Sequence, residues 1–264
     1  MGKPSLILFT RIGFAARGLT YLLIAFLAVR VGRSEDAGGA LAYLKGNTGE
    51  LVLAVMAVGF VGYGAWRLLD ATLDLHNRGS EAKGAAVRAA GVVSGLIHLG
   101  LAFSAAKLAL SDGGEGSATG RDQAEGAAAS AMELPLGEGL LFAVAFLLAA
   151  AGAVQIGVAI TRRFREHLSP EVREARWVNI VGALGYGARG VVFLVAAWLL
   201  FRAGIDHSPS QAGAVGDALR TLPGAVATLV AAGLGLFGIY SLIEARYRIL
   251  PDPHMRDRLA GALP

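Results

Sequence analysis

The strongest constraint on this chain is a series of apolar segments, each long enough to cross a membrane. Six such stretches follow one another along the 264 residues, at about 12–31, 51–71, 89–110, 136–160, 178–201 and 222–245. A membrane-spanning helix needs about 20 apolar residues at 1.5 Å rise per residue, because the hydrocarbon core is about 30 Å thick. The sequence therefore predicts an all-α membrane protein with six transmembrane helices.

The composition supports this class. Hydrophobic residues make up 55% of the chain, the mean hydropathy is +0.56, and 17% of residues are charged, whereas a soluble domain carries roughly 25% charged residues. The alternating ten-residue segments of a membrane barrel are absent from the sequence. The chain has no cysteine, so neither a disulfide framework nor a thiolate metal site is expected.

The six stretches form three similar pairs within a single membrane domain, and we number these copies 1, 2 and 3, at about 11–78, 88–166 and 176–250. Copies 1 and 3 align without a gap, which pairs Gly18 with Gly190 and Arg17 with Arg189. Copy 2 keeps the glycine at the Gly18 position. Since each copy has two spans, all copies should enter the membrane the same way up, as parallel repeats do. The simplest packing is three hairpins around a pseudo-threefold axis.

Shorter polar segments rich in alanine and glycine separate the two spans of each copy, at 36–49, 122–137 and 210–224. Their apolar residues recur every three or four positions, which predicts short helices on the outer membrane interface. The stretch 111–126 is expected to be an external loop. Ser169 followed by Pro170 predicts a helix start, and we expect that helix to continue into the fifth span.

The distribution of basic residues predicts the orientation. The N-terminal segment, the 67–88 and 162–176 loops and the C-terminal tail hold 15 lysines and arginines, whereas the alternate loops hold 7. Because cytoplasmic loops carry the excess, both termini are expected in the cytoplasm. The sequence pI is about 9.6, but the positive charges lie at membrane edges. We therefore expect anionic lipid head groups on the cytoplasmic side as partners, and no nucleic acid.

Two arginines, Arg17 and Arg189, lie well inside apolar sequence. An intramembrane arginine costs at least about 2.5 kcal/mol unless it is paired or reaches the head groups. The copies that keep this arginine also keep an acid near the end of their second span, Asp70 or Glu244, while copy 2 has Val158 there. We expect pairs within each copy, Arg17 with Asp70 and Arg189 with Glu244. A structural brace, an ion-coupled site and snorkelling to the inner head groups are the alternatives.

A basic residue also closes the first span of each copy, namely Arg30, Lys107 and Arg202. These side chains could snorkel to the outer interface. Alternatively, they could form a basic ring that lines an anion-attracting vestibule, as rings of basic side chains do in anion pores.

Copy 2 carries polar residues of its own within the spans. Ser94 replaces the inner arginine, His98 takes the place of Tyr21, and Gln155 lies in the facing span. An intramembrane histidine either forms a structural hydrogen bond or relays protons or ligates haem. A second haem-ligating histidine within the spans is missing from the sequence, since the other four lie in loops or the tail: His76, His167, His207 and His254. We therefore expect no haem.

Catalytic signatures are missing from the sequence. It shows no zinc-ligand spacing, phosphate-binding loop or serine–histidine–acid arrangement. We therefore expect a protein that is not an enzyme and that has no cofactor or metal.

The motif [GA]-x-x-A-R-G followed by an aromatic residue, with G-x-x-x-x-G-x-aromatic-x-x-x-[DE]-A in the second span, occurs in copies 1 and 3. This tandem arrangement resembles the bacterial membrane family called domain of unknown function 1206. The resemblance implies three two-helix repeats in a bacterial inner membrane, and it implies no activity. Copy 2 departs from the motif at Ser94 and Val158.

The first functional hypothesis is a non-enzymatic membrane scaffold or partner-binding protein. The second is a small channel or transporter, for example for anions, that uses Arg17, Arg189 and the outer basic ring. The third is a membrane redox subunit that uses His98.

Overall fold

The computed structural model describes residues 3–32, 34–74, 79–111 and 120–249. Six long helices lie in these ranges, and each is long and apolar enough to cross a membrane. They are α1 (Lys3–Phe26), α3 (Glu50–Leu73), α4 (Ala82–Leu110), α6 (Gly137–Thr161), α8 (Arg176–Ile205) and α10 (Gly224–Tyr247). The prediction of an all-α protein with six candidate membrane spans is confirmed.

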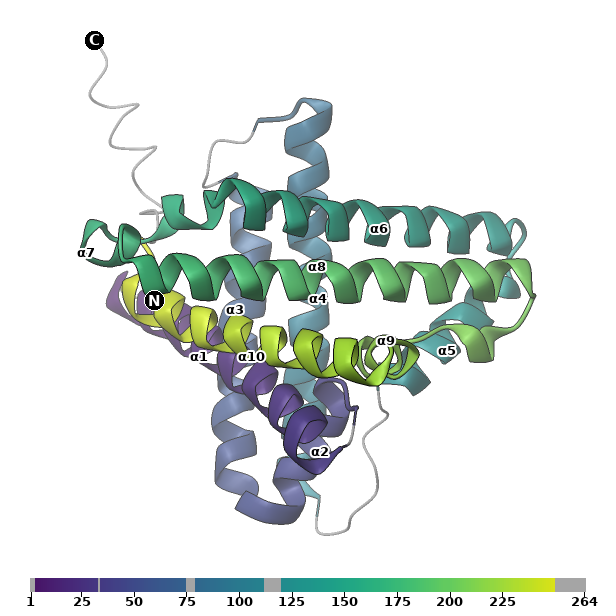
Figure 1. The fold of residues 1–264 in the computed structure, drawn as a ribbon, viewed down its shortest axis with the longest axis horizontal. Coiled ribbons are helices and arrows are strands. Elements are labelled where there is room, and N and C mark those ends of the chain that lie inside the picture. The colour runs from purple at the N-terminus through teal and green to yellow at the C-terminus, as the bar shows by residue number, and fades with distance from the viewer. Residues whose placement is uncertain (1–2, 33, 75–78, 112–119, 250–264) are drawn as a thin grey trace.

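Each copy has one shorter helix between its two spans. These helices are α2 (Ala37–Thr48) in copy 1, α5 (Gly120–Met132) in copy 2 and α9 (Val215–Thr221) in copy 3. They gather on one side of the molecule (Figure 1), and α5 touches both α2 and α9. The aspartate before α2 caps it, because Asp36 Oδ1 accepts hydrogen bonds from the backbone of Gly38 and Gly39 at 2.7 and 3.1 Å. The expectation of a loop throughout 111–126 is wrong from Gly120 onward, where α5 begins.

Some sequence predictions concern segments outside the described residues. These segments are 112–119 of the expected external loop, the positions of His76 and His254, and the tail after residue 249.

The helix predicted to start after Ser169 begins there, as α7 (Pro170–Arg173), but it does not continue into the fifth span. Ala175 has extended backbone angles, φ −64° and ψ 121°, and α8 begins at the next residue. The side chain of Asn179 donates to the carbonyl oxygen of Ala175 at 3.1 Å. The same carbonyl oxygen also accepts the first backbone hydrogen bond of α8, from the N–H of Asn179 at 3.1 Å, so Asn179 holds the start of the helix with both its backbone and its side chain.

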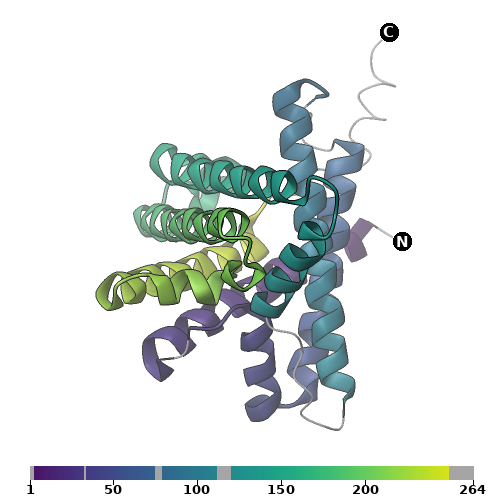
Figure 2. The same ribbon diagram turned by 90° about the vertical axis from the view of Figure 1, so that its right-hand side faces the viewer.

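The six long helices pack in the order α4, α3, α1, α10, α8, α6. In Figure 1, α3 and α4 run upright, α6 and α8 run across, and α1 and α10 lie between the two pairs; Figure 2 shows the same arrangement from the side. Spans of copies 1 and 3 pack within their copy, α1 on α3 and α8 on α10. The spans of copy 2, α4 and α6, lie at opposite ends of the order. A pseudo-threefold packing of three closed hairpins is therefore not confirmed.

Neighbouring copies meet through the same contact three times. At each contact the second span of one copy crosses the first span of the next, and the second span of copy 3 crosses the first span of copy 1. We call these contacts junction 1–2 (α3 on α4), junction 2–3 (α6 on α8) and junction 3–1 (α10 on α1). Each junction contains two glycines at equivalent repeat positions, and a Cβ on either would lie 2.8–3.0 Å from the carbonyl oxygen of the other. The pairs are Gly64 with Gly95, Gly152 with Gly190, and Gly238 with Gly18. Glycine is thus required for this approach, as in other closely packed membrane helices.

Small residues also permit the contact within copies 1 and 3. A Cβ on Gly59 of α3 would lie 2.8 Å from the Cβ of Ala16 in α1, and a Cβ on Gly233 of α10 would lie 2.4 Å from the Cβ of Ala188 in α8. In copies 1 and 3, the two helices therefore approach too closely for a larger residue at Gly59 or Gly233.

Copy 2 lacks these small residues. By the repeat alignment, Leu147 stands at the position of Gly59, and Val93 stands at the position of Ala16. Both side chains are exposed in the structure, by 65% for Leu147 and 56% for Val93. The loss of the small residues gives a physical reason why α4 and α6 do not pack together as their counterparts do.

Candidate functional site

The guanidinium group of Arg17 in α1 is buried where α1, α3 and α10 meet, and its side chain is 9% exposed. Its Nε donates to Ser241 Oγ at 3.2 Å, Nη1 donates to the Tyr63 hydroxyl at 2.7 Å, and Nη2 donates to Glu244 Oε2 at 2.5 Å. The side chain of Glu244 is 2% exposed. These contacts offset the cost of removing both charges from water.

Further groups complete this cluster. Arg248 forms an ion pair with the second carboxylate oxygen of Glu244. The Arg17 guanidinium carbon also lies 4.8 Å from the ring centre of Phe14 and 5.2 Å from that of Phe237, which are cation–π distances. Glu244 thus lies between two arginines in a buried site at junction 3–1.

The structure corrects the predicted partner of Arg17. The acid is Glu244 of copy 3, and Asp70 of copy 1 lies instead 3.7 Å from Arg67. Within junction 3–1 the Gly18–Gly238 crossing fixes the register, because Arg17 precedes Gly18 directly and Glu244 follows Gly238 by six residues, about 9 Å along the helix. The charge pair therefore joins two copies.

The same register explains the other two junctions. At junction 1–2, Asp70 occupies the acid position, and Ser94 occupies the arginine position. At junction 2–3, Val158 occupies the acid position, and Arg189 occupies the arginine position. Each of these junctions keeps one of the two charged residues, because copy 2 has lost both its arginine and its acid.

The predicted pair of Arg189 with Glu244 is also wrong, since Glu244 is engaged by Arg17 and Arg248. The Arg189 guanidinium lies 4.7 Å from the ring centre of Phe193 and 4.9 Å from that of Phe237. Its Nε is buried and has no hydrogen-bond partner within the described part of the chain. The ring of Phe237 thus contacts the guanidinium groups of both Arg17 and Arg189.

Two of the three polar residues singled out in copy 2 lie together. The Nδ1 of His98 donates to the carbonyl oxygen of Ser94 at 2.7 Å, and its ring centre lies 4.4 Å from that of Tyr63. Gln155 lies on α6 at the other end of the helix order, and its buried Oε1 accepts no hydrogen bond from the described residues. His98 is therefore a hydrogen-bonded histidine packed on aromatic rings.

No contact among the described residues joins Arg30, Lys107 and Arg202 into a ring. Arg30 is exposed at the end of the first span, and Lys107 is exposed on α4. Arg202 forms an ion pair with Asp206 at 2.7 Å. Hydrogen bonds from Arg202 and Gln211 lower the pKa of Asp206 below its ordinary value of 3.8.

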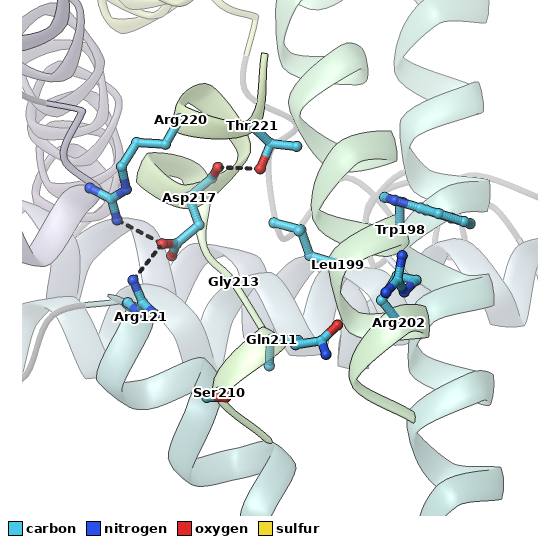
Figure 3. A pocket seen from close by; sticks show the side chains of 11 residues that line it. Arg121, Trp198, Leu199, Arg202, Ser210, Gln211, Gly213, Asp217, Arg220 and Thr221 are labelled. Atoms are coloured by element: carbon cyan, nitrogen blue, oxygen red, sulfur yellow. Dashed lines mark hydrogen bonds and ion pairs between the residues drawn. The ribbon is translucent and has the colours of Figure 1, made fainter. Parts of the chain in front are cut away.

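Arg202 instead lines a pocket of about 390 Å³ at the end of α8 together with two other arginines. Figure 3 shows those two arginines around Asp217, and Arg202 apart from them next to Trp198. Arg121 comes from α5 and Arg220 from α9, and both arginines pair with Asp217. Sequence reasoning missed this group because Arg121 and Arg220 belong to the connecting segments of different copies. The sequence does show that Arg121 and Arg220 are among the few basic residues of the outer loops, and this was the only indication that they could form a site.

A metal site of three or more histidine, aspartate or glutamate side chains does not occur within the described ranges.

Comparisons with known proteins agree with the repeat. Uncharacterized protein YxxB of Bacillus subtilis (strain 168) is 24% identical over 261 residues, which cover 93% of this chain and 92% of that relative. No solved structure matches the chain. The model of the family Domain of Unknown Function (DUF1206) matches three times, at residues 12–74, 89–162 and 184–248. These matches cover all three copies, and the chain belongs to this family of multi-pass membrane proteins.

Proposed function

We propose that this protein is a non-enzymatic scaffold of a bacterial inner membrane, in which copies 1 and 3 form the frame and copy 2 offers a contact surface. The observation that carries this proposal is the environment of Arg17. Its guanidinium donates to three side chains of the same chain, on α3 and α10, within a buried junction. A charge engaged in this way stabilises the contact between copies, whereas a transport site needs donors that a substrate can reach.

The proposed orientation places both termini in the cytoplasm and the three connecting helices on the outer membrane interface. Its support is the gathering of α2, α5 and α9 on one side of the molecule (Figure 1). The excess of lysine and arginine in the remaining loops and termini agrees with it. In this orientation, the basic loops meet anionic lipid head groups on the cytoplasmic side.

In the bilayer, the three copies take up a closed, pseudo-threefold ring. Membrane helices tilt by 0–40° from the bilayer normal, so the α3–α4 pair has to turn toward the direction of the α6–α8 pair, which it crosses in Figure 1. Support for a ring comes from the three equivalent glycine junctions, since the contact of copy 3 with copy 1 returns to the start. The side between α4 and α6 is its loosest contact because Val93 and Leu147 replace small residues.

Because this contact is the weakest of the ring, it opens, and the α4–α6 side then serves as the partner-binding surface of the scaffold. Val93 and Leu147 are exposed on this side, whereas Ala16, Gly59 and Gly233 at equivalent positions are buried. A transmembrane helix of a partner can pack on such a surface.

A flux measurement tests the scaffold against the anion-channel alternative. Proteoliposomes with the full chain should show no anion flux above that of empty liposomes, and Arg17→Met should lower the unfolding temperature. Anion flux that is abolished by Arg17→Met and by Arg189→Met, but not by the exposed control Arg163→Gln, would overturn the scaffold proposal.

Disulfide cross-linking tests the α4–α6 surface, because the chain has no native cysteine. The double variant Val93→Cys/Leu147→Cys should form an intrachain disulfide in membranes if the ring closes on itself. A disulfide between chains would identify a second copy as the partner. If neither an intrachain nor an interchain disulfide forms, and both cysteines are freely alkylated in native membranes, the result would contradict both a closed ring and an occupied surface.

A further inference from the structure

The pocket at the end of α8 is built from three segments that are far apart in the sequence. Trp198 and Arg202 come from α8, Arg220 comes from α9, and Arg121 reaches in from α5 (Figure 3). Arg220 also donates from Nη1 to the carbonyl oxygen of Ser34, at 2.7 Å, which ties α9 to the segment after the first span. The pocket therefore lies where connecting segments of all three copies meet.

The charges that line the pocket do not balance. Three guanidinium groups face one carboxylate, that of Asp217, whose side chain is 13% exposed. Asp217 accepts from Arg220 at 2.7 Å and from the backbone N–H of Ala214 at 3.0 Å, and it lies 3.5 Å from Arg121. Two further carboxylates pair with these arginines from outside the lining: Asp206 lies 2.7 Å from Arg202, and Glu125 lies 3.9 Å from Arg121. Within the lining itself, three guanidinium groups therefore accompany one carboxylate, and the other two carboxylates contact the arginines from outside the pocket.

Unused hydrogen-bond donors accompany this charge. A guanidinium group has five N–H donors, and the Arg202 contacts with Asp206 use only its Nε and one terminal nitrogen. About half of each arginine side chain is exposed, 48% for Arg121, 45% for Arg202 and 49% for Arg220. Planar, exposed guanidinium groups favour oxyanions, and they bind phosphate in a bidentate manner.

One wall of the pocket is apolar. Trp198 is 53% exposed, and its ring stacks on Phe201 with 6.0 Å between ring centres. A tryptophan and an arginine at the end of a membrane span are typical of the boundary between hydrocarbon and head groups. A ligand here can therefore place a charged group among the arginines and an apolar part against the tryptophan.

We propose that this pocket binds a phosphate-type oxyanion, and that an anionic phospholipid head group with its acyl chain along Trp198 is its natural source. The site extends the scaffold proposal, because it lies on the side of the connecting helices, opposite the basic cytoplasmic loops. Arg121 and Arg202 provide the ligand contacts, and Arg220 holds the pocket together through its contacts with Ser34 and Asp217.

Trp198 fluorescence tests the proposal in the full chain. The protein is reconstituted with brominated phosphatidylglycerol or brominated phosphatidylcholine, and the emission of Trp198 is the difference between wild type and Trp198→Phe. Phosphatidylglycerol should quench Trp198 more strongly than phosphatidylcholine does. In Arg121→Gln/Arg202→Gln, the preference should fall by about tenfold for each arginine removed, since charge-assisted hydrogen bonds are lost.

Inorganic phosphate separates the two sources of the oxyanion. A preference for phosphatidylglycerol that excess phosphate does not abolish supports the lipid, whereas phosphate that changes Trp198 emission without any lipid preference supports a soluble phosphate ligand. No lipid preference and no phosphate effect would overturn the site. The control Arg163→Gln removes an exposed arginine at the other end of α6 and α8, and an equal loss of preference there would overturn it as well.

Thermal unfolding of each variant ensures that a loss of preference is measured on folded protein. A lower unfolding temperature of Arg121→Gln/Arg202→Gln that is restored by neither lipid nor phosphate would also count against ligand binding, because a bound ligand stabilises the folded state by mass action.

Discussion

Arg17 of copy 1 and Glu244 of copy 3 form a buried ion pair with 2.5 Å between Nη2 and Oε2, although 227 residues separate them in the sequence. The pair belongs to the junction in which Gly238 crosses Gly18. The pair joins copy 3 to copy 1. Junction 3–1 is the one junction of the three in which the sequence has both an arginine at the Arg17 position and an acid at the Glu244 position.

The register of the junctions predicts the effect of restoring an acid in copy 2. Val158→Glu places a carboxylate at the position opposite Arg189, equivalent to that of Glu244. We expect Val158→Glu to be tolerated in the wild type and to be more destabilising in an Arg189→Met background, with a coupling free energy of about 0.5–3 kcal/mol. Thermal unfolding in detergent measures it. An equal cost in both backgrounds would show that the two positions do not face each other.

The glycine crossings predict a strong dependence on side-chain size. Gly238→Ala would place a Cβ 2.8 Å from the carbonyl oxygen of Gly18, so we expect a loss of about 1–3 kcal/mol in the free energy of unfolding. Gly100→Ala is the matched control, because nothing lies within 4 Å of a Cβ at that position on α4. Equal unfolding temperatures for the two variants would contradict the close crossing of α1 and α10.

The ion pair between Arg202 and Asp206, at the end of α8, should depend on pH. Arg202 lowers the pKa of Asp206 below its ordinary value of 3.8, so this contact stabilises the folded state above that pH and is lost as pH falls through the lowered pKa. Arg202→Gln should return the pKa of Asp206 toward 3.8, as followed by NMR titration of the carboxyl carbon. An unchanged pKa would mean that Arg202 does not bind Asp206 in solution.

The sequence predicts the helical class, the six spans and the repeat well, because apolar length and internal similarity are local properties of the chain. It also identifies Arg17, Asp70, Arg189 and Glu244 as a related set. It does not identify the partners, since loss of both charges from copy 2 is equally consistent with pairs within a copy and pairs between neighbouring copies. The cyclic crossing of α10 on α1 distinguishes these alternatives, and it is a property of the tertiary structure.

The arginine pocket and the separation of α4 from α6 depend on the same kind of information. Arg121 and Arg220 come together only because α5 and α9 meet. Leu147 in place of Gly59 is visible in the aligned sequence, but its consequence follows only from the 2.8 Å approach at Gly59.

A double-mutant cycle at junction 3–1 tests the central claim most directly. Arg17→Met and Glu244→Met should each lower the free energy of unfolding by about 3–5 kcal/mol, because each leaves a buried charge without its partner. The double variant should lose clearly less than the sum of the two single losses. Additive losses for Arg17 with Glu244, and a non-additive result for Arg17→Met with Asp70→Asn, would contradict a chain whose copies are joined by a charge pair between the third and the first.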